Sequence, residues 1–251
     1  MIMDYELVSL SKNEGIARVR LQRPESRNAL SSRMIKELEA VIGAVESDPD
    51  LRLMIIEGDG KAFCAGMDLK GVRDDPSAMG EMLNGLAGVS IRIRDLKIPT
   101  IARAHGAAIG GGCGLLAICD FAITHPEAKI GYPEVDLGIC PAVVAPWLIQ
   151  RIGTGKARSL LLSGGTMSGE DALAWGLVDE CVPLEELDQA VERKARRILA
   201  GGPNAIQVTK EWLNELEGDK IRQDVLKGGQ LSASVIQGEE AQSRISRLWK
   251  D

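Results

Sequence analysis

Three segments of the sequence combine residue types that could do chemistry. Residues 64–68 form a loop of small residues directly after a short apolar run. A glycine triplet, Gly110 to Gly112, leads into a helical pattern. Residues 131–138 place the carboxylate of Glu134 in a mostly apolar stretch. The three segments together predict a site built from backbone N–H groups and one carboxylate.

The glycines have a physical interpretation. A backbone N–H can approach a ligand closely where no side chain intervenes, and a helix N-terminus adds unpaired N–H groups with a partial positive charge. Two such N–H groups from separate loops could hold an oxygen that becomes negative during a reaction, which is an oxyanion hole. Glu134 would then be the general acid or base. On spacing alone, a tight turn at the triplet and a surface carboxylate at Glu134 explain the same residues.

The surrounding pattern predicts the elements that position these segments. Residues 6–10 and 16–21 are β-rich runs around a turn at Asn13-Glu14-Gly15, which favours a hairpin. Apolar residues at helical spacing follow Ser31, a suitable N-cap. Short strands are expected at 53–56, 99–102 and 121–124, with helices around 82–93 and 113–119 between them. This alternation indicates an α/β core.

Beyond about residue 185 the pattern changes to amphipathic helices. They are expected at 187–199, at 204–216 and, as one or two helices, at 221–249, with a break at Gly201-Gly202-Pro203. We therefore divide the chain into a core, residues 1–190, and a C-terminal helical region, residues 191–251.

Composition excludes several classes of protein. The chain has 251 residues and a net charge of −6, with 3% aromatic residues, which argues against nucleic-acid binding. It contains no apolar run of the length that a membrane span needs. Five cysteines without paired spacing predict reduced thiols and a cytoplasmic protein. With two histidines and no ligand-like spacing, we expect no metal site.

Three motifs carry a resemblance to a known family. They are residues 63–69 (Phe-Cys-Ala-Gly-Met-Asp-Leu), residues 105–112 (His-Gly-Ala-Ala-Ile-Gly-Gly-Gly) and residues 133–138 (Pro-Glu-Val-Asp-Leu-Gly). In order and separation they resemble the crotonase (enoyl-CoA hydratase/isomerase) superfamily, from residues 23–30 to 174–179. The resemblance implies an α/β fold with a crotonase-like ββα spiral core and a C-terminal helical region used for trimerisation, in a homotrimer or a dimer of trimers.

The same resemblance implies a coenzyme A thioester as ligand, with no permanently bound cofactor. The thioester oxygen would be held by the N–H groups of Met67 and Gly111, and Glu134 would move the proton. Cationic donors pair well with phosphate oxygens, so Lys70 and Arg27, with Arg23, are candidates to meet the phosphates. The implied substrate-binding residues are Ala65, Met67, Asp68, Leu69, Lys70, Gly111 and Arg27.

The sequence departs from the family pattern at one acid/base position. Hydratases of this family commonly carry a first glutamate two residues after the glycine triplet, where this chain has Gly114. Asp136 is a candidate second acid, because on an extended chain it would share the face of Glu134. An alanine at 142 argues against relatives that use an aspartate there. Hydration of a 2-enoyl-CoA is our first expectation. The alternatives are Δ3-Δ2 enoyl-CoA isomerisation, another single-glutamate reaction (decarboxylation or thioester hydrolysis), and CoA binding without turnover.

Other enzyme classes fit less of the sequence. Residues 112–117 match the dinucleotide pattern G-x-G-x-x-A of NAD-dependent dehydrogenases, but the pattern is short and frequent by chance, and the ribose-binding acid about 20 residues on would coincide with Glu134. A serine hydrolase is disfavoured because no G-x-S-x-G elbow is present.

Overall fold

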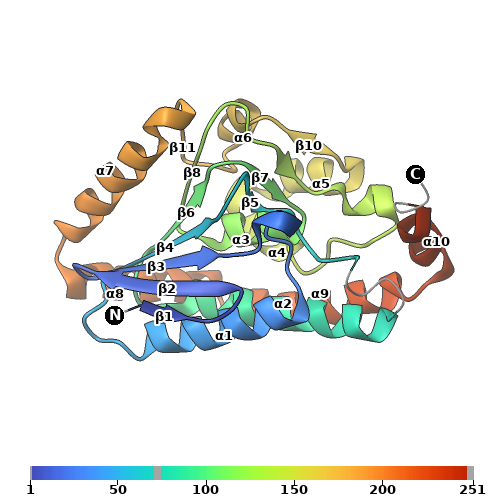
Figure 1. Ribbon diagram of the computed structural model, residues 1–251, viewed down its shortest axis with the longest axis horizontal. Coiled ribbons are helices and arrows are strands. Elements are labelled where there is room, and N and C mark those ends of the chain that lie inside the picture. The colour runs from blue at the N-terminus through green and yellow to red at the C-terminus, as the bar shows by residue number, and fades with distance from the viewer. Residues whose placement is uncertain (1, 71–74, 248–251) are drawn as a thin grey trace.

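The computed structural model of the protein describes residues 2–70 and 75–247. Along this part of the chain, two strands followed by a helix form a recurring unit (Figure 1). Its members are β4 (Leu53–Gly58), β5 (Ala62–Cys64) and α2 (Pro76–Asp95), then β6 (Thr100–Ala104), β7 (Ala107–Ile109) and α3 (Gly111–Ile118), then β8 (Phe121–Thr124) and β9 (Ile130–Gly131).

The two strands of each unit join different sheets. Within the described chain the larger sheet has the order β1-β2-β3-β4-β6-β8-β11, and the smaller has the order β10-β9-β7-β5. Each unit therefore advances both sheets by one parallel strand, and the chain winds as a spiral between them. This confirms the ββα spiral core.

The N-terminal strands form the antiparallel edge of the larger sheet. β1 (Ile2–Asp4), β2 (Val8–Asn13) and β3 (Ile16–Leu21) pair in sequence, and β3 then pairs in parallel with β4. Glu14 and Gly15 make the predicted turn with positive φ angles of 49° and 78°. The first strand of the hairpin begins at Val8 rather than residue 6. At its start the Leu7 and Val8 N–H groups donate to the Glu37 carboxylate.

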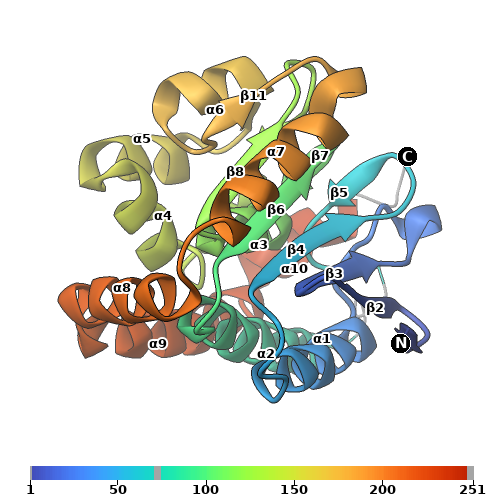
Figure 2. The ribbon, with the colours of Figure 1, turned by 90° about the vertical axis from the view of Figure 1, so that its left-hand side faces the viewer.

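Alternating residues of the central strands pack on opposite faces of this sheet. Met54 and Ile56 join the core cluster that includes α1 (Ser32–Glu46) and α2, whereas Leu53 and Ile55 pack against α7 (Leu187–Leu199) (Figure 2). A strand buried on both faces reads as a continuous apolar run, as residues 53–56 do. The helices at Ser31 and at 187–199 are confirmed. Ser31 caps α1 by accepting the Met34 N–H at 3.2 Å.

The helical region after residue 200 contains three further helices in the described chain. They are α8 (Pro203–Glu217), α9 (Asp219–Ile236) and α10 (Glu239–Arg247). The long pattern at 221–249 thus forms two helices, and its last residues lie outside the described part. α9 lies along α2 at close range, because a Cβ at Gly229 would come within 2.8 Å of the Asn84 side chain. Glycine at this position therefore lets the two helices approach.

The remaining elements connect the spiral to these helices. They are α4 (Ala145–Ile152), α5 (Thr154–Ser163), β10 (Thr166–Met167), α6 (Gly169–Trp175), β11 (Glu180–Cys181) and 3₁₀ turns at Pro24–Ser26, Pro133–Leu137 and Leu184–Glu186.

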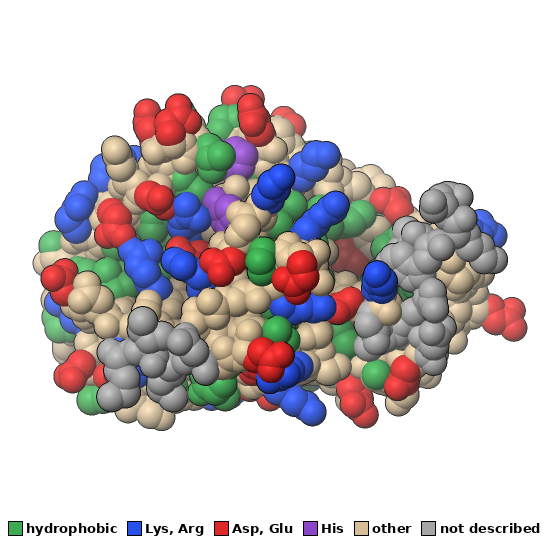
Figure 3. Space-filling view, viewed as in Figure 1, with side chains coloured by type: hydrophobic (Ala, Val, Ile, Leu, Met, Phe, Trp, Pro, Cys, Tyr) green, Lys and Arg blue, Asp and Glu red, His purple; other side chains and the backbone are tan. Residues whose placement is uncertain are grey.

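The surface carries both signs of charge. Acidic and basic side chains are interspersed over the face in Figure 3. None of the described helices is long and apolar enough to cross a membrane.

A buried lysine fixes α8 to the body of the protein. Lys210 is 6% exposed, and its ammonium donates to the Ile98 carbonyl and to Asp120 Oδ2, each at 2.8 Å. The same Asp120 oxygen accepts the Thr100 N–H at 2.7 Å. Lys210 therefore ties a helix of the C-terminal region to the start of β6.

Replacing this lysine tests the anchor. Lys210→Met keeps the apolar stem but removes the cation that contacts Asp120 Oδ2 and leaves Arg94, 3.5 Å from Asp120 Oδ1, as its remaining cation. We expect the free energy of unfolding to fall by about 2–3 kcal/mol. Lys220→Met is the control, because the exposed Lys220–Asp224 pair contributes at most about 0.5 kcal/mol. Urea denaturation of the two variants measures the difference. Equal losses would contradict the anchoring role.

Candidate active site

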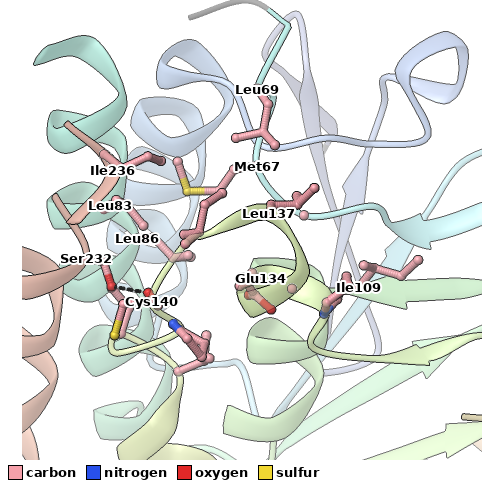
Figure 4. Close-up of a pocket in the computed structure, with 18 of the residues that line it drawn as sticks. Met67, Leu69, Leu83, Leu86, Ile109, Glu134, Leu137, Cys140, Ser232 and Ile236 are labelled. Carbon is pink, nitrogen blue, oxygen red and sulfur yellow. Dashed lines mark hydrogen bonds between the residues drawn. The ribbon is translucent and has the colours of Figure 1, made fainter. Parts of the chain in front are cut away.

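A mostly apolar pocket lies between α2, α9 and the loops that follow β5 and β7 of the smaller sheet (Figure 4). The loop after β5, the turn into α3, the 3₁₀ turn at Pro133–Leu137 and the segment after it form its walls, together with side chains from α2 and α9. Its lining residues are Ala65, Gly66, Met67, Leu69, Leu83, Leu86, Ile109, Gly110, Gly111, Pro133, Glu134, Leu137, Ile139, Cys140, Pro141, Val143, Val144, Ser232 and Ile236.

The loop after β5 and the turn into α3 touch backbone to backbone. A Cβ at Gly112 would lie 2.1 Å from the Cys64 carbonyl oxygen. A Cβ at Gly66, whose φ is +90°, would lie 2.7 Å from the Ile109 carbonyl oxygen. No side chain fits at either position, so the glycines are what allows the loops to meet.

This contact brings two N–H groups to one wall of the pocket. Gly111 is the first residue of α3, so its N–H has no partner within the helix. Leu30 donates to the Gly66 carbonyl and accepts the Asp68 N–H. Because successive N–H groups of an extended chain alternate in direction, the Met67 N–H between them points away from Leu30. In the described chain neither N–H donates to another backbone group.

Glu134 lies beside these donors. Its Oε1 comes within 2.9 Å of where a Cβ of Gly110 would be, and Gly110 has a φ of +55°. Any side chain at 110 would therefore displace the carboxylate as well as strain the backbone. Glu134 Oε2 is buried and has no hydrogen-bond partner among the described residues.

Burial sets the protonation of this carboxylate. Removal from water disfavours the charged form and raises the pKa of Glu134 from 4.5 to about 7. A carboxyl group with this pKa populates both forms at neutral pH, which suits a group that accepts a proton and returns it.

The wall at position 114 is apolar. Gly114 lies in α3, and a Cβ there would come within 2.5 Å of Val144 Cγ1. Val144 is 4% exposed and lines the pocket. Val144 therefore fills the space in which a side chain at 114 would have to begin.

Asp136 does not line the pocket. The segment that would carry it as an extended chain is a 3₁₀ turn, so Asp136 and Glu134 do not share a face. Asp136 is exposed and accepts the Gly165 N–H at 3.1 Å. The structure thus gives it a role in holding a neighbouring turn.

The predicted substrate-binding residues separate into two groups. Ala65, Met67, Leu69 and Gly111 line the pocket with Glu134, whereas the others do not. Asp68 pairs with Arg23 at 2.9 Å, and Arg23 also donates to the Ala29 carbonyl. Asp68 and Arg23 therefore brace the loop that carries Met67.

The remaining predicted contacts lie outside the pocket wall. Arg27 and Lys70 are exposed, and Lys70 is the last described residue before the gap at 71–74. Trp147, which could have bordered the acyl group, instead donates from its indole nitrogen to Ser90 Oγ at 2.9 Å inside the core. The dinucleotide-like residues 112–117 lie wholly inside α3, without the strand-to-helix loop that NAD binding requires. No group of side chains suited to a metal ion occurs among the described residues.

Sequence reasoning missed the helical residues of the pocket. Leu83 and Leu86 come from α2, and Ser232 and Ile236 come from α9. They are far from the motifs in sequence. The one local signal is the pair Gly228 and Gly229, because small residues in a helix are typical of close packing against a neighbouring segment.

Comparison with known proteins identifies the family and the fold. The profile of the enoyl-CoA hydratase/isomerase family matches residues 11–245. The chain belongs to this family.

Family members of similar sequence are named as hydratases. A crotonyl-CoA hydratase of Syntrophomonas wolfei is 37% identical over 217 residues, covering 85% of this chain and 83% of the relative. A short-chain-enoyl-CoA hydratase of Clostridium acetobutylicum is 33% identical, covering 84% and 82%. An enoyl-CoA hydratase/isomerase crystal structure from Xanthobacter autotrophicus superposes with a TM-score of 0.90 at 27% identity, over 99% of this chain and 94% of that one.

The contact between positions 114 and 144 can be measured as a coupling. Gly114→Ala places a methyl group against Val144 and should cost about 1–3 kcal/mol by overpacking. Val144→Ala removes the obstacle, so the double variant should lose at least about 1 kcal/mol less than the sum of the single losses. Chemical denaturation of the four proteins closes the cycle. Additive losses would mean that the two positions do not compete for space.

Proposed function

We propose that the protein hydrates a 2-enoyl-CoA to a 3-hydroxyacyl-CoA. The observation that carries this proposal is the Glu134 carboxylate, whose Oε2 is buried and unpartnered among the described residues, next to Gly110 and Gly111. The hydratase names of the family members support the choice of reaction.

The reaction follows from the charges that develop. The thioester oxygen accepts from the Met67 and Gly111 N–H groups, which stabilise the enolate that forms when the β-carbon is attacked. Glu134 takes a proton from water as the water oxygen bonds to the β-carbon. The carboxylic acid so formed returns a proton to the α-carbon, so one water is added and Glu134 is regenerated. The apolar wall keeps other water from the enolate.

Double-bond isomerisation is the second candidate. The tight contact of Val144 on Gly114 favours it, because Glu134 is the one carboxylate on the described pocket wall. A single carboxylate is sufficient to remove a proton from the α-carbon of a 3-enoyl-CoA and return it to the γ-carbon.

We further propose how the ligand is held. The substrate itself carries coenzyme A, and no other cofactor is needed. The acyl end contacts Ala65, Met67, Leu69 and Gly111, while Asp68 positions this loop through Arg23. The exposed cations Lys70 and Arg27 meet the phosphates of coenzyme A.

The assembly and location are also proposals. Val208, Trp212 and Leu216 are each more than half exposed and lie four residues apart on α8, which suits burial between copies in a homotrimer or a dimer of trimers. All five cysteines are described and unpaired, which suits a reducing compartment such as the cytoplasm.

Replacing the carboxylate tests its role. Glu134→Gln should lower kcat by about 10²–10⁴-fold, because the amide cannot accept the proton, while binding of an acyl-CoA persists.

In the unchanged protein, kcat/KM should fall about tenfold for each pH unit below the pKa near 7, since the base must be deprotonated. Steady-state kinetics across pH 5 to 9 measure both effects. Near-normal turnover in the variant would remove Glu134 from the mechanism.

Labelled water separates the two candidate reactions. Incubation of crotonyl-CoA in H₂¹⁸O should give a product heavier by one labelled water, with loss of the enoyl absorbance. A shift of the double bond in a 3-enoyl-CoA without water uptake would instead establish the isomerase. Mass spectrometry of both incubations distinguishes the outcomes. No change in either substrate would refute both.

A further inference from the structure

The described pocket wall has few side chains that could form a hydrogen bond or an ion pair with a polar group of the ligand. Glu134 is the charged side chain among the described lining residues, and Cys140 and Ser232 are the other two with polar side-chain atoms. Burial raises the pKa of the Cys140 thiol, so this group remains neutral. No cationic side chain lines the described pocket.

The hydroxyl of Ser232 is already in use. It donates to the Cys140 carbonyl at 2.6 Å (Figure 4). It also accepts the Ala142 N–H at 3.2 Å. Ser232 is fully buried in α9, and a Cβ at Gly228 one turn earlier would lie 2.3 Å from the Ala142 carbonyl oxygen. Ser232 therefore holds the segment 140–142 against α9, and its one hydroxyl proton is not available to a ligand.

One side chain of α9 also sets the extent of the pocket. Ile236 is 1% exposed, lines the pocket and lies near Leu83 of α2 (Figure 4). The α9 helix thus forms one wall of the pocket. Ser232 holds this helix against segment 140–142, and Ile236 lines the space that the acyl group would enter.

We propose that this pocket selects acyl groups that are hydrocarbon beyond the β-carbon, and that Ile236 limits their length. The proposal rests on the proposed acyl-CoA function. A hydrocarbon chain gains free energy from leaving water. Among the described lining residues a terminal carboxylate would find no cation to pair with, and Glu134 is the carboxylate on that wall, which would repel it.

Saturated thioesters test the selectivity without turnover. Valeryl-CoA and glutaryl-CoA both have five-carbon acyl groups and differ in the terminal carboxylate, and calorimetry gives the Kd of each. We expect glutaryl-CoA to bind at least about 100-fold more weakly. Equal binding would overturn the selectivity while leaving the acyl-CoA assignment intact. Failure of both to bind would overturn the assignment and the selectivity together.

A pair of variants on α9 tests the length limit. Ile236→Ala should improve the affinity for octanoyl-CoA relative to valeryl-CoA by about tenfold, because it opens the wall. Ser234→Ala is the control, since Ser234 is exposed on the same helix. Retained valeryl-CoA binding shows that each variant is folded. An unchanged preference in Ile236→Ala would assign the length limit to another residue and overturn this part of the proposal.

Discussion

The active-site geometry depends on one contact, the approach of the loop after β5 to the turn into α3. The two loops are in backbone-to-backbone contact at two points. Gly112 packs against the Cys64 carbonyl, and Gly66 packs against the Ile109 carbonyl. The parallel pairing of β5 with β7, which matches Cys64 with Ala108, brings the two loops to the same edge of the smaller sheet. Because the Met67 and Gly111 N–H groups follow directly from this contact, their separation is set by rigid backbone rather than by adjustable side chains.

The second constraint is the burial of a carboxylate without a partner. A hydrogen bond to the charged form of Glu134 would lower its pKa, whereas the unpartnered Oε2 leaves desolvation as the dominant influence. The cost to stability changes with pH. The folded state holds this proton more tightly than the unfolded chain, so stability falls as pH rises from about 4.5 to about 7. The same burial that lowers stability gives Glu134 a pKa near neutral pH.

The sequence predicted the elements whose cause is local and missed contacts made by distant residues. The N-cap at Ser31, the doubly buried run at 53–56 and the amphipathic helix at 187–199 each have a short-range signal, and each is present. The segment around Glu134 is a 3₁₀ turn, so the prediction of an extended chain with Asp136 on the same face as Glu134 is wrong. The roles of Lys210 and Ser232 depend on packing between segments about 90 residues apart, which no local pattern encodes.

The packing around position 114 leaves no space for a carboxylate side chain there. A glycine at 114 is not simply a missing side chain, because Val144 occupies the space in which any larger residue would begin. Restoring a carboxylate there would require Val144 to move, and Val144 shares its segment with Ala142, on which α9 lies through Gly228 and Ser232. The single-carboxylate chemistry is therefore coupled to the seating of a C-terminal helix. A change at 114 would have to be accommodated by α9, and for this reason we regard the proposed catalytic residues and the pocket wall as one packing unit.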